Sequence, residues 1–231
     1  MDAGVLGDDT WGALNVHTRR YAENERSGLM VCGINWGGKE DEPAGGASQA
    51  RSFFSDRAAN DWPFPNVLGK WFDVWGHPLQ SVRGNEGAFE KSILQTNWIP
   101  GQSSSTSNFG IESSAKESID SFVEILAETR PAMILLCSRA LGNALQDHSC
   151  LGKVEAVLGK ASQLSFIERP CIPKPGGGLY RRFHLATQTF GYTDLIVLPH
   201  PSGSRGIHVD YMAGFRQKME PILDRYKSKL A

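Results

Sequence analysis

The sequence predicts an α/β fold, a three-layer α/β/α sandwich with a central, mainly parallel four-stranded sheet. Short continuous apolar runs bounded by glycine, proline or polar residues are typical of strands buried on both faces of a parallel sheet. Such runs occupy residues 29–32, 92–98, 132–137 and 195–198. Segments of helical composition alternate with them, and this alternation is the pattern of a parallel sheet covered on both faces.

Prolines and capping residues mark the boundaries of the helices expected between these strands. Pro63 and Pro65 are expected to break the chain before a helix capped by Asn66, and Ser138 is expected to cap a later one. Pro221 is expected to interrupt or kink the last helix. Helices are predicted at residues 11–25, 48–59, 66–75, 117–129, 138–145, 154–161 and 210–230, and residues 164–167 are strand-like.

Composition places the chain among ordinary globular proteins. It has 231 residues, of which 40% are hydrophobic and 21% charged, and its formal net charge is −1. A neutral chain does not by itself announce a nucleic-acid partner. We expect one domain over residues 1–231, with residues 1–27 as a polar lead-in. The amino terminus lacks the features of a secretory signal, and no apolar run approaches the length of a membrane span, so we expect a cytoplasmic or nucleoid-associated protein without a membrane partner.

The four cysteines show no CxxC spacing. Cys32 and Cys137 lie in apolar strand-like runs, which favours buried free thiols over a disulfide framework or a metal site. We therefore expect a protein that uses neither a metal ion nor an organic cofactor.

Three of the predicted strands run into a polar residue at or just after their carboxyl ends: Asn35, Asn97 and His200. Open α/β sheets bind their ligands at this edge, so we expect the three side chains to lie together. Gly33 and Gly37 allow the backbone to turn tightly and to approach a ligand closely. The simpler alternatives are a turn asparagine at residue 35 and, at residue 200, a histidine bonded only to a turn backbone.

Two motifs resemble those of one enzyme family. Gly33-Ile34-Asn35-Trp36-Gly37 resembles the first motif of the uracil-DNA glycosylase superfamily, which reads Gly-Ile-Asn-Pro-Gly in the mismatch-specific branch. The stretch Leu-Pro-His-Pro-Ser-Gly at residues 198–203 resembles the second motif, a His-Pro-Ser loop. Asn97 sits where the single-strand-selective branch carries its base-reading asparagine. The resemblance covers residues 28–228, with Trp36 in place of the usual proline.

This resemblance implies a monofunctional DNA glycosylase of base-excision repair. Such an enzyme hydrolyses the N-glycosidic bond of uracil or a 5-substituted pyrimidine in DNA and leaves an abasic site. The implied partner is single- or double-stranded DNA, and we expect a monomer. Two alternatives stay open, a catalytically weak nucleic-acid-binding member of the same fold and a hydrolase of free nucleosides or nucleotides.

The resemblance also implies roles for individual residues. Asn35 and His200 are the implied catalytic residues. Contacts to the base are assigned to Gly33, Ile34, Trp36, Gly37, Phe53, Phe54 and Asn97, with Phe64 as the third candidate for the aromatic ring that stacks on the base. Contacts to the DNA are assigned to Ser202, Gly203, Ser204 and Arg205, with the two serines and nearby backbone N–H groups on phosphates and Arg205 in the space that the flipped base leaves.

The chemistry agrees with these residue types. A flipped base must be recognised by its edge, and the amide of Asn97 can pair with the O4 and N3–H of uracil. Cleavage leaves negative charge on the departing base, and a preorganised donor such as His200 aimed at O2 is worth roughly 2.7–4 kcal/mol in the transition state. Asn35 can orient a water molecule by hydrogen bonding.

Substitution of Gly37 tests which bases can enter the pocket. The uracil-restricted branch has a tyrosine at this position that blocks the space beside C5 of the base, whereas glycine leaves this space open. We expect base release from uracil and from at least one 5-substituted pyrimidine in DNA, and Gly37→Tyr should suppress the second far more than the first. A methylene in an apolar pocket is worth about 1–3 kcal/mol, so kcat/KM for both substrates should reveal the change. Strict uracil specificity in the unaltered chain, with both rates equally affected by Gly37→Tyr, would contradict this assignment.

Overall fold

A mixed six-stranded sheet with the strand order β2-β1-β3-β6-β5-β4 forms the centre of the molecule. The computed structural model describes residues 11, 14–35, 63–79, 86–101, 110–168, 176–178, 184–202 and 207–230. The strands are β1 (Leu29–Gly33), β2 (Ile93–Asn97), β3 (Met133–Leu136), β4 (Ser165–Glu168), β5 (His184–Phe190) and β6 (Thr193–Val197).

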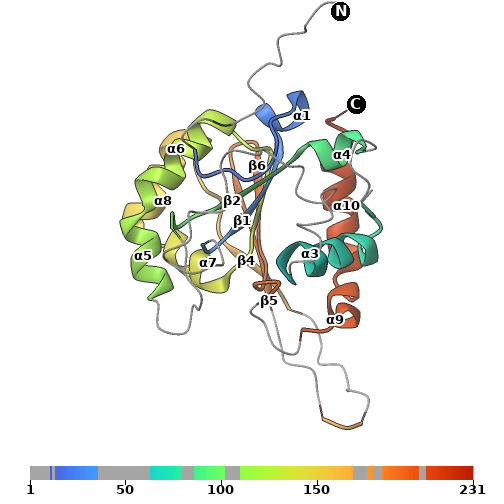
Figure 1. The fold of residues 1–231 in the computed structure, drawn as a ribbon. Helices are drawn as coiled ribbons and strands as arrows, with labels where there is room; N and C mark the ends of the chain where they lie inside the picture. The colour runs from blue at the N-terminus through green and yellow to red at the C-terminus, as the bar shows by residue number, and fades with distance from the viewer. Residues whose placement is uncertain are drawn as a thin grey trace, which may run out of the picture.

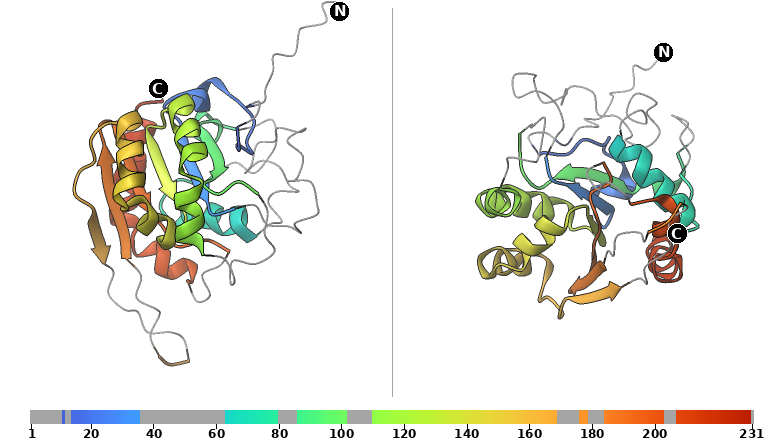
Figure 2. Two further views of the ribbon diagram at one scale, coloured as in Figure 1. Left: turned by 90° about the vertical axis from the view of Figure 1, so that its left-hand side faces the viewer. Right: turned by 90° about the horizontal axis from the view of Figure 1, so that it is seen from below.

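Helices cover both faces of this sheet. The helices are α1 (Ala22–Glu25), α3 (Pro63–Val74), α4 (Ala88–Lys91), α5 (Ile111–Glu117), α6 (Ile119–Thr129), α7 (Arg139–Leu145), α8 (His148–Leu158), α9 (Val209–Ala213) and α10 (Arg216–Lys227). Helices α5 to α8 lie on one face, whereas α3, α9 and α10 lie on the other (Figure 1; Figure 2, right). The predicted α/β class is therefore confirmed.

The prediction of a four-stranded sheet is wrong, because β4 and β5 extend it. Strands β2, β1, β3 and β6 are parallel, as predicted, and β5 is antiparallel to both β6 and β4. The predicted strands are continuous apolar runs because both their faces are covered. In contrast, β5 reads His-Leu-Ala-Thr-Gln-Thr-Phe and mixes exposed with buried positions, so it lacks the apolar run by which the other strands are recognised.

Several predicted helix boundaries are also wrong, and the helix predicted over residues 154–161 is α8, which runs from His148 to Leu158. Helix α3 begins at Pro63 and contains Pro65 in its first turn. Proline is tolerated there because the first backbone N–H groups of a helix have no partner within it. Near the carboxyl terminus, the interruption falls at Gly214–Phe215, between α9 and α10, and Pro221 lies inside α10.

In the described part of the lead-in, residues 11 and 14–27, the helix predicted over residues 11–25 is limited to the single turn α1. Val16 forms an isolated antiparallel bridge with Thr96 of β2, and the His17 N–H donates to the Gln95 carbonyl at 2.9 Å. The edge strand β2 therefore has its outer side occupied by the lead-in. The helix predicted over residues 48–59 lies outside the described residues.

The core consists of one apolar cluster on each face of the sheet. Alternate strand residues divide between them, so Met30 and Cys32 face one cluster while Leu29 and Val31 face the other. The thiols of Cys32 and Cys137 are buried and free, as predicted, and burial raises the pKa of both. Among the described helices, none is both long and apolar enough to cross a bilayer.

The parallel strands end together at one edge of the sheet. Gly33 pairs with Asn97 and Leu136 with Val197 in the strand register. The pairing of β1 with β2 continues past both strands, because the Ile99 N–H donates to the Ile34 carbonyl at 2.9 Å. The turns that follow β1, β2 and β6 are thus brought to the same edge.

Trp98, directly after β2, anchors this edge to the helical layer. Its ring is fully buried and stacks on Phe122 of α6 with a centroid distance of 4.2 Å, and its Nε1–H donates to the Ala115 carbonyl at 2.8 Å. We expect Trp98→Ala to lower the free energy of unfolding by about 3–5 kcal/mol, measured by urea denaturation. Tyr192→Ala, at an exposed position, should change it by no more than about 0.5 kcal/mol. Equal effects of the two substitutions would contradict the anchoring role.

Candidate active site

Asn97 and Gly33 are in direct contact at the carboxyl ends of β2 and β1. An ideal Cβ placed on Gly33 would lie 2.2 Å from Asn97 Oδ1, so the amide occupies the space that any larger residue would need. Asn97 is buried, with 4% of its surface exposed. Because residue 33 has no side chain, the Asn97 amide can lie over the β1 backbone, in the space where a Cβ would be.

The backbone of Asn97 is held from the other side by the lead-in. Asn15 Nδ2 donates to the Asn97 carbonyl at 2.9 Å, and Thr96 Oγ1 donates to the Asn15 carbonyl at 2.5 Å. Asn15 was not recognised from the sequence, because a single polar residue in a polar segment carries no local signal. Its role depends on a contact between residues separated by 82 positions.

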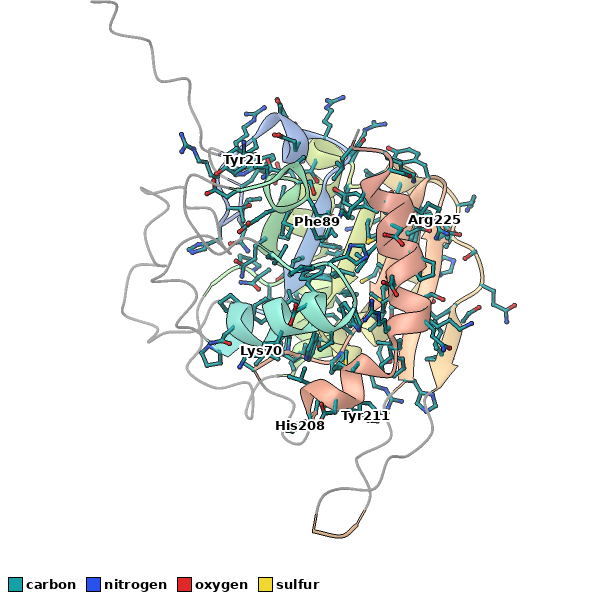
Figure 3. All side chains as sticks on the ribbon, turned by 90° about the vertical axis from the view of Figure 1, so that its right-hand side faces the viewer. Tyr21, Lys70, Phe89, His208, Tyr211 and Arg225 are labelled. Atoms are coloured by element: carbon teal, nitrogen blue, oxygen red, sulfur yellow. The ribbon has the colours of Figure 1, made fainter. Side chains whose placement is uncertain are left out.

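Phe64 connects Gly33 with His200. Its Cε2 lies 3.6 Å from the ideal Cβ position on Gly33, and its ring centroid is 5.3 Å from that of His200, with the rings tilted by 59°. Phe64 comes from the first turn of α3, which packs against α9, the helix that follows the His200 loop. Figure 3 shows Lys70 of α3 near Tyr211 of α9 and near His208, which directly precedes α9, at this end of the molecule.

His200 follows β6 by three residues and has a half-buried side chain. Burial lowers the pKa of His200 to about 4, because the charged imidazolium loses hydration there. The ring is therefore neutral at pH 7. A neutral imidazole carries one N–H donor and one acceptor nitrogen, so it can donate a hydrogen bond without adding a charge to the site.

Ser202 lies beside His200. Its Oγ is 3.2 Å from His200 Nδ1. If the hydroxyl donates to Nδ1, the ring proton is on Nε2, because a neutral imidazole has only one. The structure thus places Ser202 next to the imidazole, whereas the resemblance implied a contact with the DNA backbone.

Asn35 and Ile34 come directly after β1. Ile34 is buried in the core with 4% of its surface exposed, which makes it a packing residue, and Asn35 is half-buried. β3 lies between β1 and β6, so two strand spacings, roughly 10 Å, separate the strands that lead to Asn35 and His200. The ring of Phe64 lies beside Gly33, the last residue of β1, and beside His200, which follows β6.

The structure therefore places the predicted residues Gly33 and Asn97 in contact and connects them with His200 through the ring of Phe64, which is the aromatic member of the site. Phe64 was only the third candidate from sequence, because its proximity to His200 depends on the packing of α3. The remaining predicted residues lie outside the described part of the chain: Trp36, Gly37, Phe53, Phe54, Gly203, Ser204 and Arg205. Within the described residues, no three histidine, cysteine or carboxylate side chains are grouped so that they could hold a metal ion.

Comparison of the sequence with protein-family models gives no match, and a search of curated proteins gives none either.

The titration of His200 tests the electrostatics of the site. We expect its imidazole resonances, followed by 1H–15N NMR and assigned with His200→Gln, to titrate near pH 4. Because the folded pKa lies below the ordinary value of 6.5, the unfolded chain binds more protons between these values. The contribution of neutral His200 to stability is therefore complete above pH 6.5 and is lost as the pH falls towards 4. Titration at the ordinary histidine value would contradict the burial of this ring.

Proposed function

We propose that the chain is a monofunctional DNA glycosylase that releases uracil or a related pyrimidine from DNA. One observation carries this proposal: the buried amide of Asn97 and the ring of Phe64 both lie at Gly33, and a neutral His200 lies against the same Phe64 ring. A planar, uncharged ligand with donors and acceptors on its edge suits these three side chains. A nucleobase turned out of the DNA stack is such a ligand.

Recognition of the base uses Phe64 and Asn97. The flipped base stacks on the face of Phe64, which offsets part of the few kcal/mol that unstacking from DNA costs. Asn97 supplies one donor and one acceptor to the pyrimidine edge, and its contact with Gly33 prevents the amide from moving towards β1. Because a buried polar group left unpaired is costly, this fixed amide discriminates between bases by their hydrogen-bonding pattern.

Bond cleavage uses His200. As the N-glycosidic bond breaks, negative charge develops on the base and positive charge on the sugar. The neutral imidazole donates from Nε2 to the base O2, and this bond strengthens as the charge grows, so it stabilises the transition state more than the ground state. An imidazolium would also bind this oxygen, but the burial that lowers the pKa of His200 disfavours it.

Asn35 orients the attacking water molecule in this proposal. It follows β1, on the opposite side of β3 from His200, so a base held between them has the leaving-group donor and the water-orienting amide on different sides. An amide cannot accept a proton as a carboxylate does, so Asn35 contributes by positioning. The oxygen of this water bonds to C1′ of the sugar cation and its proton passes to solvent, while the departed base anion takes up a proton from solvent, so the products are the abasic sugar and the neutral base.

Two substitutions test the assignment directly. Asn35→Ala and His200→Ala should each lower the rate of base release by about a hundredfold or more, because each removes one preorganised hydrogen-bonding group. The substrate is a uracil-containing oligonucleotide, and alkaline cleavage of the abasic site gives the rate. His148→Ala, which removes an exposed histidine at the start of α8, is the matched control and should leave the rate unchanged.

The same assay separates the alternatives. Near-normal rates in folded Asn35→Ala and His200→Ala variants would overturn the assignment of the catalytic residues. Base release from free deoxyuridine as fast as from the oligonucleotide would indicate a nucleoside hydrolase. Oligonucleotide binding without release of any tested base would indicate a binding protein.

A further inference from the structure

A cavity opens between α7 and the strands β4, β5 and β6, on the face of the sheet opposite to the one on which Phe64 packs. Its apolar floor is formed by Gly142 of α7, by Leu164, by Ala186 of β5 and by Val197 of β6. Gly142 allows α7 to approach the sheet, since an ideal Cβ there would lie 2.8 Å from Val197 Cγ1. Close packing of helix on strand thus builds the floor.

The rim of this cavity carries polar and aromatic side chains. Arg139 and Asn143 of α7 face Phe166 of β4 and His184 of β5 across it, and no acidic side chain is among the described residues that line it. Outside the lining, Glu112 accepts a hydrogen bond from Asn143 at 2.9 Å. The rings of Phe166 and His184 are in T-shaped contact, with centroids 6.2 Å apart. The cavity therefore presents one cation, one amide and two rings over an apolar floor.

Phe166 is the unusual member of this set. It is 66% exposed, and among the described residues only Tyr192 is another large hydrophobic side chain with comparable exposure. An exposed ring at the mouth of a cavity, opposite an arginine, is the arrangement that stacks a planar group and binds an anion attached to it. Phe166 pairs with Ala186 in the strand register, which fixes it on the face of the sheet towards the cavity.

The cavity lies at the same edge of the sheet as the candidate active site. Ala186 pairs with Val197, and His184 precedes it by two residues in the antiparallel strand, so His184 lies beyond the end of β6 where the chain continues to His200. The sheet edge formed by β4 and β5 is seen in Figure 2. A polymer bound across the carboxyl ends of the strands can therefore reach both places.

The size of the cavity indicates what it holds. Its volume is about 90 Å³, well below the roughly 300–1,000 Å³ of pockets that enclose a whole small molecule. It can accommodate one ring of a ligand that is held elsewhere. We propose that it binds a flanking nucleotide of the same DNA strand, a few positions from the excised one, with the base stacked on Phe166 and a phosphate paired with Arg139.

This site rests on the proposed function for its biological meaning, but it can be tested by binding alone. The probe is a short fluorescein-labelled oligodeoxyadenylate, which contains no pyrimidine, and the measurement is its Kd by fluorescence anisotropy at constant ionic strength. Phe166→Ala and Arg139→Ala should each raise the Kd by about tenfold, the scale of one stacked base or one charge-assisted phosphate contact. Phe166→Trp should preserve binding, because it retains a stacking face.

The controls are matched by residue type and exposure. Tyr192→Ala removes an exposed ring from the turn between β5 and β6, at the opposite edge of the sheet, and Arg26→Ala removes an exposed arginine before β1. Both should bind the probe like the unaltered chain. A Kd raised equally by the controls, or unchanged in Phe166→Ala and Arg139→Ala, would overturn the proposed site.

Failure of this site and failure of the glycosylase proposal give different results. Normal uracil release with oligodeoxyadenylate binding that is independent of Phe166 and Arg139 would overturn only the flanking-nucleotide site. Binding that depends on both residues, in a chain that releases no base, would keep this site and overturn the glycosylase proposal.

Discussion

The contact between Gly33 and Asn97 is the constraint on which the candidate site depends. Two parallel strands end side by side, and the amide of one occupies the Cβ space of the other. A side chain at residue 33 would push the amide outwards and with it the turn after β2. The lead-in restrains the same residue through the hydrogen bond from Asn15 to the Asn97 carbonyl. A buried polar group is thereby held in one orientation, which is what discrimination by hydrogen bonding requires.

Packing around this contact sets the electrostatics of the site. Helices α3 and α9 pack together at the carboxyl edge, which brings Phe64 against the imidazole of His200. Reduced hydration keeps that ring uncharged, and Ser202 beside Nδ1 favours a proton on the other nitrogen. One apolar side chain thus serves two purposes in the proposed enzyme. It offers a stacking face, and it contributes to the low polarity in which a single donor has its largest effect.

Strands β4 and β5 extend the sheet beyond the strands that lead to the candidate site and place further side chains at the same edge. Four parallel strands suffice to align the turns that carry Asn35, Asn97 and His200. The antiparallel strand β5 begins beside the chain that leads to His200, and β4 presents Phe166 at the same edge. An enzyme acting on a polymer must bind more than the reacting unit, and binding of neighbouring units positions that unit for reaction. The cavity between α7 and strands β4, β5 and β6 suits such a role in the proposed glycosylase.

The sequence by itself determined the α/β class, the four parallel strands and the polar residues at their ends, because burial on both faces leaves a local apolar pattern. Caps such as Ser138, whose Oγ accepts from the Leu141 N–H, were also predictable, since they depend on near neighbours. Strand β5 was not predicted, because its two faces are unequally covered and its sequence lacks an apolar run. Pro63 was expected to break the chain before α3, whereas a proline in the first turn of a helix is compatible with it. Tertiary structure alone decided that Phe64 meets His200, that Asn15 holds Asn97 and that His200 is neutral. Each of these depends on segments distant in sequence, and the pKa depends on how much water their packing removes.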